Sequence, residues 1–163
     1  MDQLYPLSFI PLFKEKVWGG RRLESWFTAM PQGPIGEAWV LSAHPHGMTL
    51  VENGPLAGKT IAELLVEHGE GLAGSAGRCG DSPTPTECSE FPVLIKLLNS
   101  NDDLSVQVHP GPENAVAHPG ASAKSEMWII LEADPGAAII HGLREGVTPQ
   151  KFHEAARSGD VMD

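Results

Sequence analysis

One short stretch carries side chains that could bind a cation. Residues 105–110 read Ser-Val-Gln-Val-His-Pro, so polar and apolar side chains alternate with a period of two. On a β-strand, Ser105, Gln107 and His109 would then share one face, with valines on the other. An amide oxygen and an imidazole nitrogen can both coordinate a metal ion. The stretch therefore predicts a polar lining with two metal donors, backed by a core.

A second stretch repeats this alternation. In residues 124–130, Lys124 and Glu126 would lie on one face of a strand, and Met127 and Ile129 on the other. If this strand shares a barrel with residues 105–110, a carboxylate joins the amide and the imidazole. The two stretches together predict a metal site with three protein ligands.

A lysine interrupts the apolar run of residues 91–98, which predicts a buried strand. An ammonium group in such a run must pair with an acid, reach water along its flexible stem, or lose its proton. The sequence alone favours the stem reaching water. A turn over residues 99–103 would bring Lys96 near the polar face of the strand that follows.

Other polar residues have simpler interpretations. Residues 36–42 predict a strand on which Glu37 and Trp39 share a face; a site carboxylate is possible there, but a solvated edge charge is more common. His44 and His46 flank a proline and precede a glycine, which favours turn histidines over metal ligands. Helix-dipole and surface explanations suffice for two further histidines, His118 and His153.

Local signals predict the remaining elements. Thr60 and Glu63 have the capping-box spacing, which predicts a helix over residues 60–67, and Thr148-Pro149 predicts one over 149–158. Residues 111–118 predict a short helix, and residues 137–143 a strand. Two prolines suggest that residues 4–13 run along a sheet edge, and Gly19-Gly20 predicts a tight turn. Residues 69–90, rich in Gly, Ser, Pro and Thr, predict a long flexible loop.

Composition limits the classes of protein. The 163 residues suffice for one domain, and 18 Gly and 14 Pro among short apolar runs favour strands joined by turns. A formal net charge of −10 argues against a nucleic-acid ligand. We see neither a membrane-spanning stretch nor a signal peptide, so we expect a cytoplasmic protein with Cys79 and Cys88 reduced.

Four separated motifs, in order, resemble a known family. They are VWGGRRL, GEAWVLSAHPHG, FPVLIKLLNSNDDLSVQVHP and KSEMWIILEA. This set, which extends over nearly the whole chain, is similar to type I mannose-6-phosphate isomerase, a zinc-dependent enzyme of the cupin superfamily. The resemblance implies a mainly β fold, a cupin-type jelly-roll barrel with a few short helices, as one domain over residues 1–163.

The resemblance also implies roles for particular residues. Gln107, His109 and Glu126 match metal ligands of the family, here for Zn²⁺. Lys96 and Lys124 match lysines of substrate binding or proton transfer, and Ser105 is expected at the substrate. The expected reaction interconverts mannose 6-phosphate and fructose 6-phosphate, an aldose and a ketose, through an enediol. Neither the general base nor the metal in the cell can be read from the residues.

The family's last metal ligand is a histidine in a later segment that this sequence does not contain. We therefore expect a barrel that is incomplete at its C-terminus, with little or no activity in this chain and possible self-association through exposed sheet edges. An iron-dependent cupin is disfavoured because Gln107 stands where those enzymes usually carry a histidine. The second alternative is a non-catalytic cupin module that binds metal or sugar.

Overall fold

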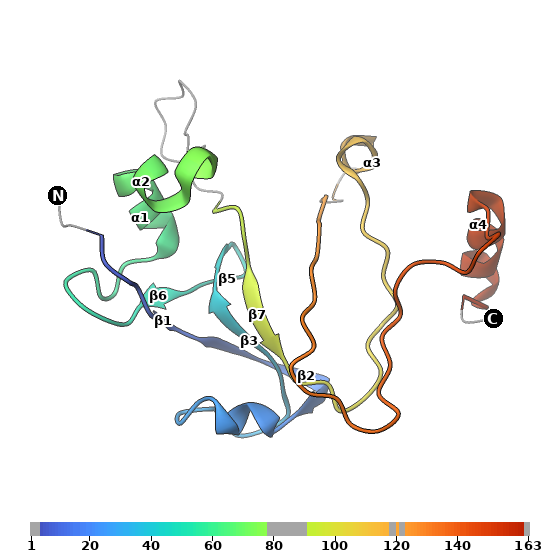
Figure 1. Ribbon diagram of the computed structural model, residues 1–163, viewed down its shortest axis with the longest axis horizontal. Coiled ribbons are helices and arrows are strands. Elements are labelled where there is room, and N and C mark those ends of the chain that lie inside the picture. The colour runs from blue at the N-terminus through green and yellow to red at the C-terminus, as the bar shows by residue number, and fades with distance from the viewer. Residues whose placement is uncertain (1–3, 78–90, 118–119, 121–122, 162–163) are drawn as a thin grey trace. The chain divides into compact units, whose positions relative to one another are not determined.

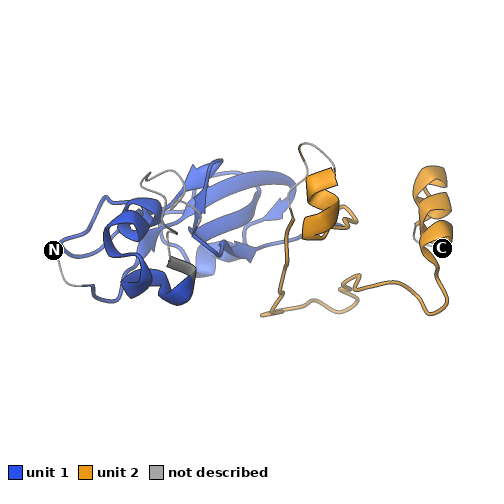
Figure 2. Ribbon diagram, turned by 90° about the horizontal axis from the view of Figure 1, so that it is seen from above, with its two compact units in different colours: residues 1–104 blue, residues 105–163 orange. Residues whose placement is uncertain are grey.

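A computed structural model describes residues 4–77, 91–117, 120 and 123–161. The chain divides into two compact units, residues 1–104 and 105–163 (Figure 2). The chain is mainly β with a few short helices. No helix in the described ranges is both long and apolar enough to cross a membrane.

The first unit contains a three-stranded antiparallel sheet (Figure 1). The strands β2 (Leu12–Gly20), β3 (Ile35–Leu41) and β7 (Ile95–Leu98) lie in the order β2-β3-β7. Trp39 lies opposite Lys96 of β7, and Glu37 lies opposite Lys14 of β2. Because side chains alternate along a strand, this register puts two lysines, a glutamate and a tryptophan on one face.

The other face of the sheet covers a hydrophobic cluster. Its buried members come from the 3-10 helix η1 (Arg22–Ser25), the loop after it and β3, and they are Leu23, Met30, Ile35 and Ala38. Phe13, Phe27 and Leu97 pack against them. The strand expected over residues 36–42 forms as β3, and Glu37 and Trp39 share one of its faces as expected.

A second cluster anchors the best-predicted helix. The N-cap of α1 (Ile61–His68) is Thr60, and the reciprocal hydrogen bonds of its capping box with Glu63 confirm the predicted start. Leu64 is fully buried with Val51 and Leu56. Two strand pairs lie in the same unit: β1 (Phe9–Ile10) with β6 (Leu50–Val51), and β4 (Ala43–His44) with β5 (Gly47–Met48).

The loop expected over residues 69–90 is wrong in its first part. Residues after α1 form α2 (Glu70–Ala73) and the 3-10 helix η2 (Gly74–Gly77). Short helical turns of this kind close their own backbone hydrogen bonds, so they need no long apolar pattern to form. Residues 78–90, with Cys79 and Cys88, lie outside the described residues.

The turn predicted at Gly19-Gly20 is also wrong, because β2 continues through both residues. Glu15 and Gly20 both pair with Ile35, so the strand bulges between them. A Cβ atom on Gly19 would lie 2.6 Å from the backbone nitrogen of Gly36. The glycine therefore permits two strands to approach closely and does not supply a positive φ.

The expected buried strand over residues 91–98 is shorter and more exposed than predicted. Only Ile95–Leu98 form β7, and Ile95 is 48% exposed. β7 is an edge strand in the order β2-β3-β7. A run of apolar residues indicates burial on both faces only for a strand inside a sheet, which explains the error.

In the second unit, helices match the expectations and strands do not. The helices α3 (Pro112–Ala117) and α4 (Pro149–Ser158) form, the latter with Thr148 as N-cap and Gly159 in the left-handed conformation. Residues 105–110, 124–130 and 137–143 carry no strand assignment. Strand assignment needs a hydrogen-bonded partner backbone, and alternation alone does not provide one. Apolar side chains there stay exposed, Met127 by 84%.

Candidate metal and substrate site

The side chains of Glu37, Trp39 and Lys96 contact one another on the polar face of the sheet in the first unit. The indole nitrogen of Trp39 donates a 2.6 Å hydrogen bond to Glu37 Oε2, and Lys96 Nζ lies 3.3 Å from the same oxygen. Lys96 Nζ also lies 4.9 Å from the centroid of the Trp39 ring. The Glu37 side chain is only 13% exposed. Its charge is therefore held in place by two neighbouring groups.

Lys96, the lysine within the apolar run, forms an ion pair with Glu37. The sequence alone favoured a stem that reaches water, but the ammonium contacts the Glu37 carboxylate and the Trp39 ring, and the side chain as a whole is 29% exposed. Lys14 Nζ lies 4.7 Å from the same ring centroid, and Lys16 Nζ 4.0 Å from Glu37 Oε1. Two lysines beside the Glu37 carboxylate and a third over the Trp39 ring make a local positive field in an acidic protein.

Glu37 was missed as a candidate because a lone glutamate on a strand is usually solvated. Burial raises its pKa, but the Trp39 hydrogen bond and the Lys96 charge outweigh burial and hold the pKa below its usual value. The signal that could have found it was a complementary charge on another strand, Lys96. Only the strand register shows that the two meet.

Glu37→Gln is expected to lower the free energy of unfolding at pH 7 by about 1–3 kcal/mol, since Lys96 loses its charged partner. The lowered pKa of Glu37 means that its stabilisation is present above the unfolded pKa and is lost as the pH falls through the folded pKa. The wild-type advantage should therefore shrink as the pH falls below about 5, as urea unfolding at several pH values would measure. Exposed Glu52→Gln is the control; an advantage that grows toward acid would contradict this reasoning.

In the second unit, two predicted metal ligands meet. His109 Nε2 lies 3.0 Å from Glu126 Oε2, and Lys124 Nζ lies 2.7 Å from Glu126 Oε1. The hydrogen bond from Lys124 and its charge, with a smaller effect of His109, lower the pKa of Glu126 against the opposing effect of burial. The side chains of His109 and Glu126 are 26% and 40% exposed. An ion could therefore reach both donors.

The third predicted ligand, Gln107, has a different neighbour. Its amide nitrogen donates a 2.8 Å hydrogen bond to Ser105 Oγ, which leaves the amide oxygen as the group able to coordinate. The structure thus brings His109, Glu126 and Lys124 together, and separately Ser105 and Gln107. Lys96 belongs to the other unit, with Glu37.

The donor set suits a divalent cation. Two ligands of a tetrahedral zinc ion at about 2.0–2.1 Å are about 3.3 Å apart, and the histidine nitrogen and carboxylate oxygen are 3.0 Å apart. No cluster of three or more His, Cys, Asp and Glu side chains occurs among the described residues. A complete site would therefore need donors of another type, such as the Gln107 amide.

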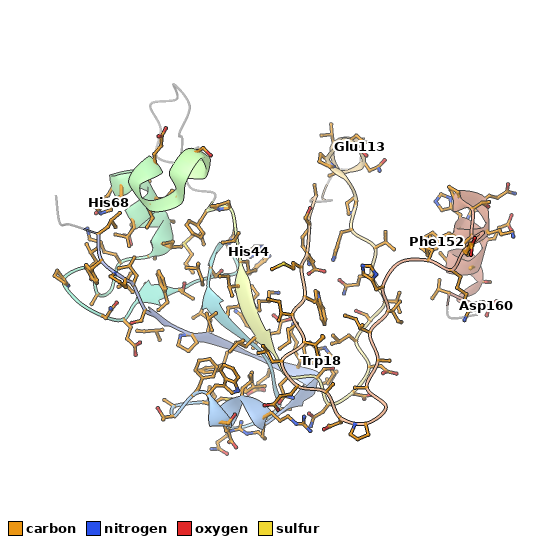
Figure 3. The ribbon with its side chains drawn as sticks, in the orientation of Figure 1. Trp18, His44, His68, Glu113, Phe152 and Asp160 are labelled. Atoms are coloured by element: carbon orange, nitrogen blue, oxygen red, sulfur yellow. The ribbon has the colours of Figure 1, made fainter. Side chains whose placement is uncertain are left out.

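The turn histidines behave as the sequence suggested. Pro45 and His46 form the turn between β4 and β5, and the backbone N–H of His46 donates a 3.1 Å hydrogen bond to His44 Nδ1. His44 is labelled in Figure 3. This bond occupies one ring nitrogen of His44 in holding the turn. His118 lies outside the described residues.

Comparisons with known proteins point in one direction. The family model "Phosphomannose isomerase type I, catalytic domain" matches residues 7–140. The chain is 40% identical over 158 residues to the Bacillus subtilis protein named "Probable mannose-6-phosphate isomerase GmuF", covering 96% of this chain and 46% of that protein. It is 38% identical over 156 residues to the mannose-6-phosphate isomerase of Streptococcus mutans, covering 95% and 46%.

A solved structure is also similar. The mannose 6-phosphate isomerase from Bacillus subtilis matches with a TM-score of 0.56 and 42% identity, over 69% of this chain and 32% of that one. The chain spans about half the length of the curated relatives it matches.

Proposed function

Because the chain belongs to the type I phosphomannose isomerase family, we propose that it serves the zinc-dependent interconversion of mannose 6-phosphate and fructose 6-phosphate. The observation that carries this proposal is the family match over residues 7–140. The relatives' printed names supply the substrate. The fold proposed with it is the cupin jelly-roll barrel, supported by the similarity to a solved mannose 6-phosphate isomerase.

His109, Glu126 and Gln107 would hold the metal ion. With one anionic and two neutral ligands, this set leaves part of the ion's charge uncompensated. When bound, zinc supplies a Lewis acid that polarises oxygen atoms of the sugar. The 3.0 Å distance between His109 Nε2 and Glu126 Oε2 supports this choice of ligands, because the two donors are close enough to bind one ion.

The lysines supply positive charge where the reaction develops negative charge. Aldose and ketose interconvert by moving a proton between two sugar carbons, and the intermediate enediol carries charge on its oxygens. Lys96 is fixed by Glu37 and Trp39, its side chain is partly exposed, and its ammonium can bind an anionic oxygen. Lys124, next to Glu126, can bind substrate or transfer a proton, and Ser105 can donate a hydrogen bond.

The proposal is tested by measuring zinc uptake, affinity for mannose 6-phosphate and turnover on the purified chain. We expect one zinc ion per chain and affinity for the sugar phosphate that falls on chelation and in Lys96→Met. An exposed lysine on α4, replaced in Lys151→Met, is the charge-matched control. Zinc-dependent formation of fructose 6-phosphate supports an isomerase, and metal-dependent binding without turnover favours the non-catalytic module. The proposal is overturned if the chain does not bind zinc, or if its affinity for mannose 6-phosphate is unchanged both by chelation and in Lys96→Met.

A further inference from the structure

Both oxygens of the Glu126 carboxylate are engaged by neighbouring side chains. The ammonium of Lys124 lies 2.7 Å from Oε1, and the imidazole of His109 lies 3.0 Å from Oε2. We propose that Lys124 competes with the metal ion for Glu126, so that metal binding releases the Lys124 ammonium for the anionic substrate. This inference rests on the proposed function, because it assumes that Glu126 is a metal ligand.

The competition follows from charge. A divalent ion held by His109 and Glu126 would lie within a few ångströms of Lys124, and like charges at that distance repel each other. The Lys124 side chain is 45% exposed, so solvent weakens this repulsion without removing it. The effect expected on the dissociation constant of the metal is on the order of tenfold.

The side chain of Lys124 is free to make this exchange. It has a four-carbon stem, and among the described residues its ammonium contacts Glu126. Once the carboxylate is committed to the metal, the ammonium can swing toward a new anion. The site would then gain affinity for a sugar phosphate only after it holds the metal, which imposes an order of binding.

The other candidate lysine has no such freedom. Lys96 is paired with Glu37, that carboxylate is also fixed by Trp39, and Glu37 is not one of the predicted metal ligands. Metal binding should therefore leave the Glu37–Lys96 pair intact. The two lysines, equivalent in the family resemblance, would act differently: Lys96 as a fixed charge and Lys124 as a charge that the metal makes available.

The first test measures zinc affinity at one pH by competition with a chromophoric chelator. Lys124→Gln is expected to bind zinc on the order of tenfold more tightly than wild type, because the competing charge is gone. Lys124→Arg keeps the charge at the same position and should stay within about threefold of wild type. Lys151→Gln on α4 removes the same charge elsewhere in the unit, and its zinc affinity should also stay within about threefold of wild type.

A second measurement uses the wild-type chain and so does not depend on a variant that folds. Acetylation of individual lysines is followed by mass spectrometry with and without zinc. The rate at Lys124 should rise several-fold with zinc, and the rate at Lys151 should not change. In the same sample, Lys96 should also keep its rate.

The outcomes separate the two proposals. A wild-type chain that binds no zinc overturns both this inference and the metal centre of the proposed function. Zinc binding that is unchanged or weaker in Lys124→Gln, or a Lys124 acetylation rate that ignores zinc, overturns the competition alone. Tighter binding in Lys124→Gln together with faster acetylation in wild type supports it.

Discussion

Replacing Glu126 with glutamine is expected to weaken zinc binding by at least about 100-fold, because even partners outside the ligand shell cost 10–100-fold when they are lost. Glutamine keeps the size of the side chain and removes its charge. Glu126 is the only anionic residue among the three predicted ligands, so the variant would leave the ion with neutral donors. The variant would also remove the negative charge that the Lys124 ammonium contacts. Zinc affinity measured by chelator competition checks the result.

The control for this prediction is Glu145→Gln. Glu145 is an exposed carboxylate in a turn of the same unit, so the change removes an identical charge without touching His109 or Glu126. Its zinc affinity should stay within about threefold of wild type, as expected for an exposed carboxylate whose charge the solvent screens. If both variants bind zinc with the same affinity, Glu126 is not a metal ligand, and the proposed metal site is wrong.

Elements defined by local signals could be predicted from the sequence. The capping box at Thr60 and Glu63 and the Thr148-Pro149 start of α4 are set by backbone groups within one turn, so a few adjacent letters suffice. β3 was visible for a related reason, since its alternation reflects one covered face and one polar face. These are features whose cause lies within the segment itself.

Features with long-range causes were missed or misread. Gly19 looked like a turn glycine, but the need for it comes from Gly36 on the neighbouring strand. Glu37 looked solvated, but Lys96 of β7 and Trp39 hold it in place. Neither partner can be identified without the register of β2, β3 and β7, and register is a property of the assembled sheet.

In the candidate site too, the features with local causes were predicted and those with long-range causes were not. The alternation around His109 and around Glu126 predicted which side chains share a face, and the structure places those two within 3.0 Å. It did not predict that Lys124 would take the other carboxylate oxygen, because two residues on one face can point to different partners. The role of Gln107 and the identity of the metal stay predictions.

The stability of the first unit should depend strongly on one leucine of α1. Leu64 is fully buried and packs with Val51 and Leu56, so Leu64→Ala is expected to lower the free energy of unfolding by about 2–5 kcal/mol. The loss combines the removed apolar contacts with the cavity that the rigid surroundings leave unfilled. Val66→Ala on the same helix is the control, because Val66 is 45% exposed and should cost less than about 1 kcal/mol.

Urea unfolding followed by tryptophan fluorescence suits this measurement, since three of the four tryptophans, Trp18, Trp26 and Trp39, lie in the first unit. Trp39 contacts Glu37 and Lys96, so its signal also reports on the polar face of the sheet. If the unit unfolds cooperatively, Leu64→Ala will lower the midpoint reported by these three tryptophans, although none of them belongs to the hydrophobic cluster of Leu64. A tryptophan transition that does not move while helix content is lost would show that the α1 cluster unfolds separately, and that the Glu37–Lys96 pair depends only on its own sheet.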